Sequence, residues 1–284
     1  MAGTAVRFLG QDCIELNLPE GDRAIVALQG AQLLSWTPAG GPERLYLSPK
    51  AVFDGHTAIR GGVPVCFPQF NQRGPLPKHG FVRNRRWTPL PPTGESGADG
   101  VVVMALRDDE PSRALWPHAF DARLEIALQP QSVTIAFFVE NTGAAAFDFT
   151  LALHSYLTTS DIGAARLHGL DGLPVWDSVD DTHPAPLAAG EPLVFAGETD
   201  RVYQAAAAPL VLADGLGELS IAQDPVFGQT VVWNPGAVLC ARLADMPDDG
   251  YRRMVCVEAA EIDTPVRLEP GASWSGAQRL THRG

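Results

Sequence analysis

The residues best suited to anion binding and acid–base chemistry gather in a segment that has neither helical nor strand periodicity. Residues 58–70 and 77–84 are rich in glycine and proline, which hold an irregular backbone and let it approach a ligand closely. Arg60 and Arg83 could hold an anion, and His79 could donate a hydrogen bond or move a proton. The segment therefore predicts a ligand site built on a rigid loop.

Two more titratable residues fall within runs that have strand periodicity. In residues 147–157 the odd positions are mainly Phe and Leu and predict a core face, which puts His154 on the opposite, more polar face. Such a face could also be ordinary solvent-exposed surface. Glu258 is the lone carboxylate of residues 254–260, where small and apolar neighbours would raise its pKa and favour a general base. The alternative is a strand end that turns outward into Glu261 and Asp263.

Other polar and aromatic side chains admit both a functional and a structural interpretation. Trp233 could offer an apolar face to a pyranose ring, or it could be part of the core. The amide of Gln69 could hydrogen-bond a sugar hydroxyl. Arg85 and Arg86 are interpreted mainly as solvated surface, because runs of charge usually have that role.

Net charge and cysteine usage limit the classes of partner and compartment. The 284 residues carry a formal net charge of -12, so binding to nucleic acid or to an anionic membrane, which needs a basic surface, is not expected. Cys13, Cys66, Cys240 and Cys256 form no CxxC pair, which predicts neither a disulfide framework nor a zinc site. No apolar run approaches the ~20 residues of a membrane helix, and no signal-peptide pattern is present. A cytoplasmic protein is therefore expected.

Short strand-like runs separated by Gly, Pro, Asp and Asn clusters dominate the chain and are typical of a β sandwich or barrel. We expect strands at residues 24–28, 33–36, 101–106, 123–128, 133–140, 147–158, 193–195, 219–222, 230–233, 238–242 and 254–260. Residues 129–132 predict a hairpin turn, and residues 110–116 could form one helical turn. Residues 90–100 and 183–190 are expected to be exposed loops within a single domain that spans residues 1–284.

Several short motifs occur in the order found in one known family. They are IRGG at 59–62, PVCFPQF at 64–70, HGFVRNRRW at 79–87, WPHAF at 116–120, LALHSYL at 151–157, ETDRVY at 198–203, VVWNP at 231–235 and MVCVEAA at 254–260. Through them the chain resembles the aldose-1-epimerase-like superfamily, specifically its glucose-6-phosphate 1-epimerase branch. The resemblance implies an all-β, galactose-mutarotase-like β supersandwich of antiparallel sheets, with the active site in a cleft on a concave sheet face.

The resemblance also implies roles for individual residues. LALHSYL makes His154 the general acid, and MVCVEAA makes Glu258 the general base. His79 would line the sugar site, and Asp200, within ETDRVY, would hydrogen-bond sugar hydroxyls, although an ordinary turn aspartate is the alternative. The complete set of substrate-binding residues predicted in this way is Arg60, Gln69, His79, Arg83, Asp200 and Trp233.

The implied reaction is interconversion of the α and β anomers of a hexose 6-phosphate, most simply D-glucose 6-phosphate, by acid–base ring opening and closure. Such a reaction needs no cofactor and no metal, and the expected partner is the phosphorylated hexose alone, bound by a monomer. Two alternatives remain open. One is an epimerase of free aldoses, in which Arg60 and Arg83 would be structural. The other is a non-catalytic carbohydrate-binding module, which would need an aromatic platform but no acid–base pair.

Overall fold

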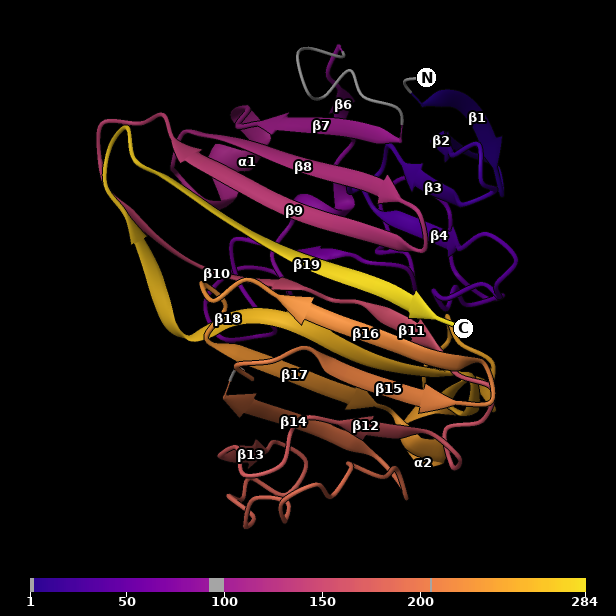
Figure 1. Ribbon diagram of the computed structural model, residues 1–284. Coiled ribbons are helices and arrows are strands. Elements are labelled where there is room, and N and C mark those ends of the chain that lie inside the picture. The colour runs from indigo at the N-terminus through magenta and orange to yellow at the C-terminus, as the bar shows by residue number, and fades with distance from the viewer. Residues whose placement is uncertain (1–2, 92–99, 205) are drawn as a thin grey trace.

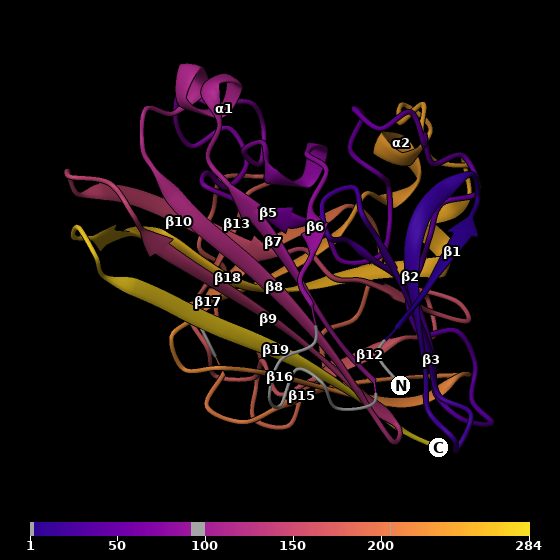
Figure 2. The same ribbon diagram turned by 90° about the horizontal axis from the view of Figure 1, so that it is seen from above.

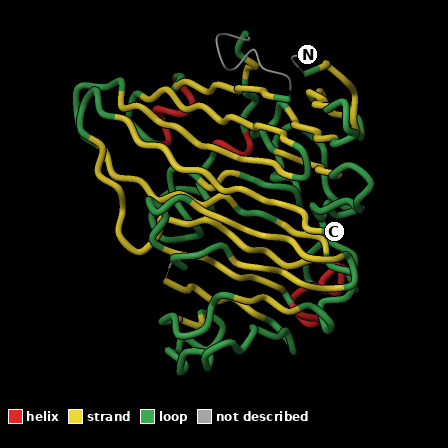
Figure 3. Tube along the Cα trace, viewed as in Figure 1, coloured by secondary structure: helices red, strands yellow, loops and turns green. Residues whose placement is uncertain are grey.

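The computed structural model describes residues 3–91, 100–204 and 206–284, which form three antiparallel sheets with only short helices between their strands (Figure 1; Figure 3). The all-β prediction is therefore confirmed. Residues 92–99, which fall within the expected loop at 90–100, lie outside the described part of the chain, whereas residues 183–190 form the expected exposed loop.

An eight-stranded sheet forms one layer of the molecule and lies in front in Figure 1. Its strands, in spatial order, are β12 (Arg166–His168), β15 (Leu210–Asp214), β16 (Gly217–Gln223), β19 (Ser273–Arg283), β9 (Ser132–Asn141), β8 (Phe120–Gln129), β7 (Val101–Arg107) and β6 (Thr88–Pro89). Gln129 pairs with Ser132, so the predicted hairpin turn between β8 and β9 is confirmed.

A seven-stranded sheet forms the second layer and carries most of the predicted chemistry (Figure 2). Its order is β13 (Val175–Asp177), β14 (Thr199–Gln204), β17 (Gln229–Asn234), β18 (Met254–Leu268), β10 (Phe147–Leu153) and β5 (Val65–Cys66), and β11 (Tyr156–Thr158) also pairs with β18. On β18, alternate residues such as Val255 and Val257 belong to the main core. The residues between them, including Glu258, therefore face the other side of the sheet.

The main hydrophobic cluster draws residues from all three sheets and runs along the chain from Ile14 to Leu280. A smaller four-stranded sheet adds β1 (Thr4–Phe8), β2 (Gln11–Asn17), β3 (Arg23–Ala27) and β4 (Leu33–Thr37). One shared core of this kind favours the single-domain organisation, which stays a prediction.

The helices are short connections at the edges of the sheets. They are α1 (Glu110–Leu115), α2 (Gly236–Cys240) and the 3-10 turns η1 (Val82–Asn84) and η3 (Gly250–Arg253). The helical turn expected at residues 110–116 is confirmed by α1, whose N-cap Asp109 accepts a hydrogen bond from the Ser112 N–H at 2.8 Å. Within the described ranges, none of the helices has the length and apolar character that crossing a membrane would require.

The expected strand at residues 238–242 is wrong, because α2 occupies this part of the chain. The strand β17 stops at Asn234, whose side-chain oxygen accepts a hydrogen bond from the N–H of Gly236 at 2.8 Å. Gly236 adopts a φ of +59°, which turns the chain out of the sheet. Periodicity does not separate a short buried helix from a strand in an apolar run of this length.

Candidate active site

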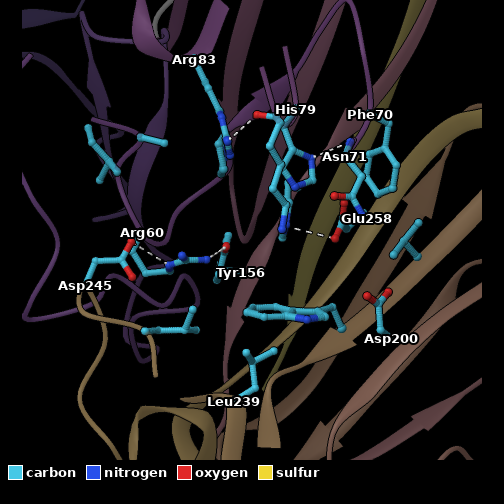
Figure 4. A pocket seen from close by; sticks show the side chains of 18 of the residues that line it. Arg60, Phe70, Asn71, His79, Arg83, Tyr156, Asp200, Leu239, Asp245 and Glu258 are labelled. Carbon is cyan, nitrogen blue, oxygen red and sulfur yellow. Dashed lines mark hydrogen bonds and ion pairs between the residues drawn. The ribbon is translucent and has the colours of Figure 1, made fainter. Parts of the chain in front are cut away.

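A pocket of about 250 Å³ lies over the face of the seven-stranded sheet that is turned away from the main core (Figure 4). Its floor is made by side chains of β14, β17 and β18 and of the β10–β11 segment. Its walls come from residues 58–83 and from the segment that follows α2. Of the eight predicted site residues, the pocket brings together Arg60, His79, Arg83, His154, Asp200, Trp233 and Glu258.

Strand register places the two predicted proton-transfer residues opposite each other. The strand β10 ends at Leu153 and β11 begins at Tyr156, and both pair with β18 in one continuous register. That register sets His154 directly across from Glu258, and His154 Nδ1 lies 3.3 Å from Glu258 Oε1. On its other side the His154 N–H donates to the carbonyl oxygen of Pro64 at 3.0 Å. The backbone of His154 is therefore held between the Pro64 segment and β18, which sets the imidazole beside Glu258.

Both members of this pair are removed from water. Glu258 is 1% exposed and His154 is 7% exposed, so the alternative of an outward-facing surface strand does not hold. Burial raises the pKa of Glu258 well above its ordinary value, and the charge of Asp200 raises it further. Burial lowers the pKa of His154, and the nearby cations, among them Arg83, lower it further. Both shifts favour the uncharged form of the pair, in which Glu258 carries the proton and His154 is neutral.

Two buried polar atoms of the pair are left without a hydrogen bond among the described residues. Within the described part of the chain, His154 Nδ1 and Glu258 Oε2 are buried and have no hydrogen-bond partner. Because His154 Nδ1 is on the side of the carboxylate, Nε2 is the ring nitrogen left for a ligand in the pocket that His154 lines. Unsatisfied buried polar atoms are costly, and such groups in a pocket indicate a site that a polar ligand completes.

Aromatic rings hold the imidazole of His154 from two sides. The ring of Tyr156 stacks on it with centroids 4.7 Å apart and an interplanar angle of 6°. Trp233 meets it edge-on at 6.2 Å. Trp233 is half-buried and lines the pocket, so it combines the two interpretations left open by its sequence context.

The pocket holds His79 in one tautomer. The backbone N–H of Asn71 donates to His79 Nδ1 at 3.3 Å, so the proton of the neutral ring is on Nε2. Burial, followed by the charges of Arg83, Lys78 and Arg60, lowers the pKa of His79 to about 2. This histidine therefore stays neutral and acts as a hydrogen-bond donor.

The residue after His79 explains the shape of its loop. Gly80 has a φ of +69°, and a Cβ there would lie 2.0 Å from the carbonyl oxygen of Phe67. Only glycine allows the two segments of the loop to approach so closely. The glycine of the HGF motif is therefore required for packing, and this packing holds His79 at the pocket.

Three cations, Arg60, Lys78 and Arg83, line the pocket, and their environments differ. Arg60 Nε lies 3.1 Å from the carboxylate of Asp245, and Arg60 Nη1 donates to the hydroxyl of Tyr156 at 3.0 Å (Figure 4). Arg83 donates to the carbonyl oxygen of Lys78 at 2.9 Å. Among the described residues, neither Arg83 nor Lys78 has an acidic partner. The positive charge available to a ligand is therefore mainly that of Arg83 and Lys78.

Asp200 and Glu198 form an acidic patch on the side of Trp233. Asp200 pairs with Trp233 between β14 and β17, which places the two side chains on the pocket face. Burial raises the pKa of Asp200, and burial and the charge of Asp200 raise the pKa of Glu198. These carboxylates can accept hydrogen bonds from hydroxyl groups, which is the role predicted for Asp200.

The structure does not place Gln69 in the pocket. Its amide nitrogen donates to the carbonyl oxygens of Asn71 and Leu76, both at 3.0 Å, and its oxygen accepts from the N–H of Leu76 at 2.9 Å. These bonds fasten the loop that carries His79. Gln69 is therefore a structural residue of the loop, and the predicted contact with a sugar hydroxyl is corrected.

Sequence reasoning missed Tyr156, Lys78 and Asp245, all of which line the pocket. Tyr156 shares strand parity with His154, and Lys78 precedes His79, so both gave a signal that could have been used. Asp245 gave none, because 185 residues separate it from Arg60.

Three of the buried side chains could also hold a metal ion. Ligand atoms of His154, Cys256 and Glu258 all lie within 4.8 Å of one another. A nitrogen, a thiolate and a carboxylate are ligands that Zn²⁺ accepts. The expectation that no metal is needed stays a prediction, since acid–base ring opening can be completed by the two proton-transfer residues alone.

Comparison with known proteins bears on the chemistry of this site. The family model described as aldose 1-epimerase matches residues 12–281. A protein of Escherichia coli named "Putative glucose-6-phosphate 1-epimerase" is 40% identical over 84% of this chain and 79% of its own length. A protein of the same name from Cenchrus ciliaris is 36% identical over 91% of this chain and 80% of its own length.

Solved structures give the same picture at the level of the fold. A "putative mutarotase" from Salmonella typhimurium superposes with a TM-score of 0.85 and 31% identity, and the match covers 99% of this chain and 98% of that one. A galactose mutarotase related enzyme from Lactobacillus acidophilus has a TM-score of 0.74 at 14% identity and covers 96% of this chain and 97% of that one. The predicted galactose-mutarotase-like sandwich is confirmed.

Proposed function

The chain belongs to the aldose 1-epimerase family, and we propose that it interconverts the α and β anomers of a hexose 6-phosphate, with D-glucose 6-phosphate as the substrate. One observation carries the proposal. The buried contact between His154 and Glu258 lies in the same pocket as Arg83 and Lys78, two cations without acidic partners among the described residues. The acid–base pair matches the anomeric end of this substrate, and the anion site in the same pocket matches its 6-phosphate. The relatives named as glucose-6-phosphate 1-epimerases support the same assignment.

The reaction begins when Glu258, as the carboxylate, removes the proton of the anomeric hydroxyl. His154, as the imidazolium, gives its Nε2 proton to the ring oxygen, and the bond between the anomeric carbon and the ring oxygen breaks. The products of this step are the open-chain aldehyde, a neutral His154 and a protonated Glu258. The aldehyde then rotates about its bond to the neighbouring carbon. Closure on the other face, with the proton transfers reversed, gives the other anomer and restores the pair.

Burial of the pair suits a reaction that must run in both directions. Before the step the pair is Glu258 carboxylate with His154 imidazolium, and afterwards both residues are neutral. The low dielectric opposes the charged form, whereas the attraction across 3.3 Å favours it. The directions of both pKa shifts favour the neutral form, so the charged pair that begins the step is the minor form and is stabilised by this attraction.

The remaining pocket residues orient the sugar. The Nε2–H of His79 offers a hydrogen bond, and Asp200 accepts one from a sugar hydroxyl. Trp233 supplies an apolar ring face at the side of the pyranose. The 6-phosphate is placed against Arg83 and Lys78, with the remaining edge of Arg60 beside them.

One observation favours epimerisation of free aldoses as a second candidate. Arg60 is paired with Asp245, so part of its charge is compensated without any phosphate. A non-catalytic carbohydrate-binding role gains no such support, because a module that only binds has no use for a buried acid–base pair.

We also propose the cytoplasm as the compartment and the phosphorylated hexose as the partner, without nucleic acid or membrane and with a monomer as the working state. All four cysteines are free and buried, which fits a reducing compartment.

Exchange NMR between the two anomers tests the proposal. Glucose 6-phosphate and glucose are compared at equal concentration, with the uncatalysed exchange of each subtracted. The proposal expects a much larger kcat/KM for glucose 6-phosphate. Equal values for the two sugars would favour the free-aldose activity, and no enzymatic exchange of either would exclude both.

A further inference from the structure

We infer that the phosphate end of the pocket is an activator site in its own right, so that a free phosphite dianion bound there accelerates anomer exchange of a sugar that carries no phosphate. The inference rests on the proposed function and deepens it. It assigns the substrate's phosphate a part in turnover beyond tethering.

The first argument is a continuous chain of contacts from the anion side to the acid. Arg60 donates to the hydroxyl of Tyr156 at 3.0 Å, and the ring of Tyr156 stacks on the imidazole of His154 at 4.7 Å. The planes of the two rings are almost parallel, with an angle of 6° between them. A shift of the Arg60 guanidinium toward a bound anion therefore acts on the ring that sets the orientation of His154.

Asp245 keeps this chain in place before any anion arrives. Its carboxylate holds Arg60 Nε at 3.1 Å, and its backbone carbonyl accepts a hydrogen bond from the hydroxyl of Ser48 at 2.7 Å. The side chains of Arg60 and Asp245 are 23% and 22% exposed, so solvent screens the pair only in part. Asp245 is thus a positioning residue, and Arg60 has one edge left for the anion.

The second argument is the charge around the acid. Arg60, Lys78 and Arg83 line the pocket together with His154 and oppose its protonation, as the lowered pKa of His154 indicates. A dianion at these cations offsets their charge and makes the imidazolium easier to form. The acidic groups and the other histidine that line the pocket around His154 add no positive charge to that of the three cations. They are Glu258 from β18, Asp200 from β14, Glu198 before it, Asp245 after α2, and His79, which stays neutral.

Binding energy from a remote group speeds a reaction only when it is used in the transition state. Both arguments connect the anion to the protonated form of His154, which is the form that donates its proton to the ring oxygen. The phosphate is therefore expected to raise kcat as well as to lower KM.

The test separates the sugar from its anion. D-Xylose has the pyranose ring of glucose without C6, so it leaves the anion side of the pocket free for inorganic phosphite. Exchange of the xylose anomers is followed by NMR at constant ionic strength, with sodium phosphite added against sodium chloride. Because oxyanions also catalyse mutarotation in water, the Glu258→Gln protein at the same phosphite concentration supplies the background.

We expect phosphite to raise the enzymatic exchange of xylose about tenfold or more in a saturable manner, and to inhibit turnover of glucose 6-phosphate competitively. Arg83→Ala should abolish the saturable activation. Arg86→Ala, at an arginine that is outside the pocket and paired with Asp12, is the matched control and should leave it unchanged. Tyr156→Phe should retain phosphite affinity but reduce the activation factor, with a lower kcat and a similar KM for glucose 6-phosphate.

Two results would overturn the inference. One is a protein that prefers glucose 6-phosphate over glucose but exchanges xylose at the same rate with and without phosphite; the proposed function would then stand alone. The other is an equal loss in Tyr156→Phe with and without phosphite, which would make Tyr156 structural and remove the chain from Arg60 to His154. A protein without preference for glucose 6-phosphate would instead contradict the proposed function itself.

Discussion

His154 and Glu258 lie at directly opposite positions of neighbouring antiparallel strands, with the imidazole Nδ1 3.3 Å from the carboxylate Oε1. The relationship is set by the backbone ladder of the sheet. The predictions that follow depend on this geometry.

Replacing His154 by Asn should lower kcat/KM for anomer exchange by roughly 10²–10⁴, because the ring oxygen leaves poorly without a proton. The wild type should show a bell-shaped pH profile. Turnover falls at low pH, where the pair gains a second proton, and at high pH, where it loses the last one.

The pH profile needs a control for the substrate, since a phosphate monoester titrates near pH 6. Glucose at high concentration gives a profile without that ionisation. A flat profile with glucose between about pH 5 and pH 9, with chemistry limiting the rate, would count against His154 as the acid.

The cations should separate the two sugars. Arg83→Ala should weaken glucose 6-phosphate binding by roughly 1.5–3 kcal/mol, or one to two powers of ten, and leave the slow reaction of glucose nearly unchanged. Arg60→Ala should weaken it at least as much, because it leaves the Asp245 carboxylate without its partner beside the anion. A double change of Arg60→Ala with Asp245→Asn should recover part of that loss. KM and kcat for both sugars are the measurement.

Arg85→Ala and Arg86→Ala serve as controls for the previous prediction. Arg85 is paired with Asp109 and Arg86 with Asp12, and neither lines the pocket. Both changes should have a smaller effect than Arg83→Ala. If Arg60→Ala and Arg83→Ala reduce turnover of the two sugars equally, both arginines are structural and the phosphate assignment fails.

The buried carboxylate should cost stability as the pH rises. Burial raises the pKa of Glu258 in the folded protein above its ordinary value of 4.5. The contribution of Glu258 to the free energy of unfolding is therefore fully present below pH 4.5 and decreases as the pH rises toward the folded pKa. Glu258→Gln removes this titration. Urea unfolding at about pH 5 and pH 8 should therefore show the variant gaining stability relative to the wild type at the higher pH. An identical difference at both pH values would mean that Glu258 is ionised in the folded protein.

Removal of metals should leave the activity intact. The proton transfers assigned to His154 and Glu258 need no Lewis acid, so prolonged treatment with EDTA followed by desalting should not lower kcat/KM. Binding of zinc by His154, Cys256 and Glu258 would occupy the same atoms and inhibit. Loss of activity on chelation, restored by a divalent ion, would reverse the assignment.

The alternation of apolar and polar residues predicted the strands well where one face of the strand packs against the core. The alternation of Phe and Leu in residues 147–153 correctly identified the face of β10 that belongs to the main cluster. It did not show whether the opposite face is exposed or buried, because the segments that cover it are distant in sequence. His154 and Tyr156 are buried for that reason.

The site could be predicted as far as its residues lay in motifs. The eight candidates came from such segments, and seven of them share one pocket. Gln69 shows that a motif does not establish the role of each of its residues. Its motif is present, but its amide hydrogen-bonds the backbone of the loop and does not line the pocket. Asp245 shows the other limit, since a long-range ion pair has no local pattern.

The most direct measurement of the central claim is anomer exchange of glucose 6-phosphate by Glu258→Gln. The substitution keeps the shape of the side chain and its capacity to hydrogen-bond, but it removes the base. We expect kcat/KM to fall by roughly 10²–10⁴ after the uncatalysed exchange is subtracted, while binding of the sugar phosphate changes little. Near-normal turnover in this variant would contradict the account and remove Glu258 from the mechanism.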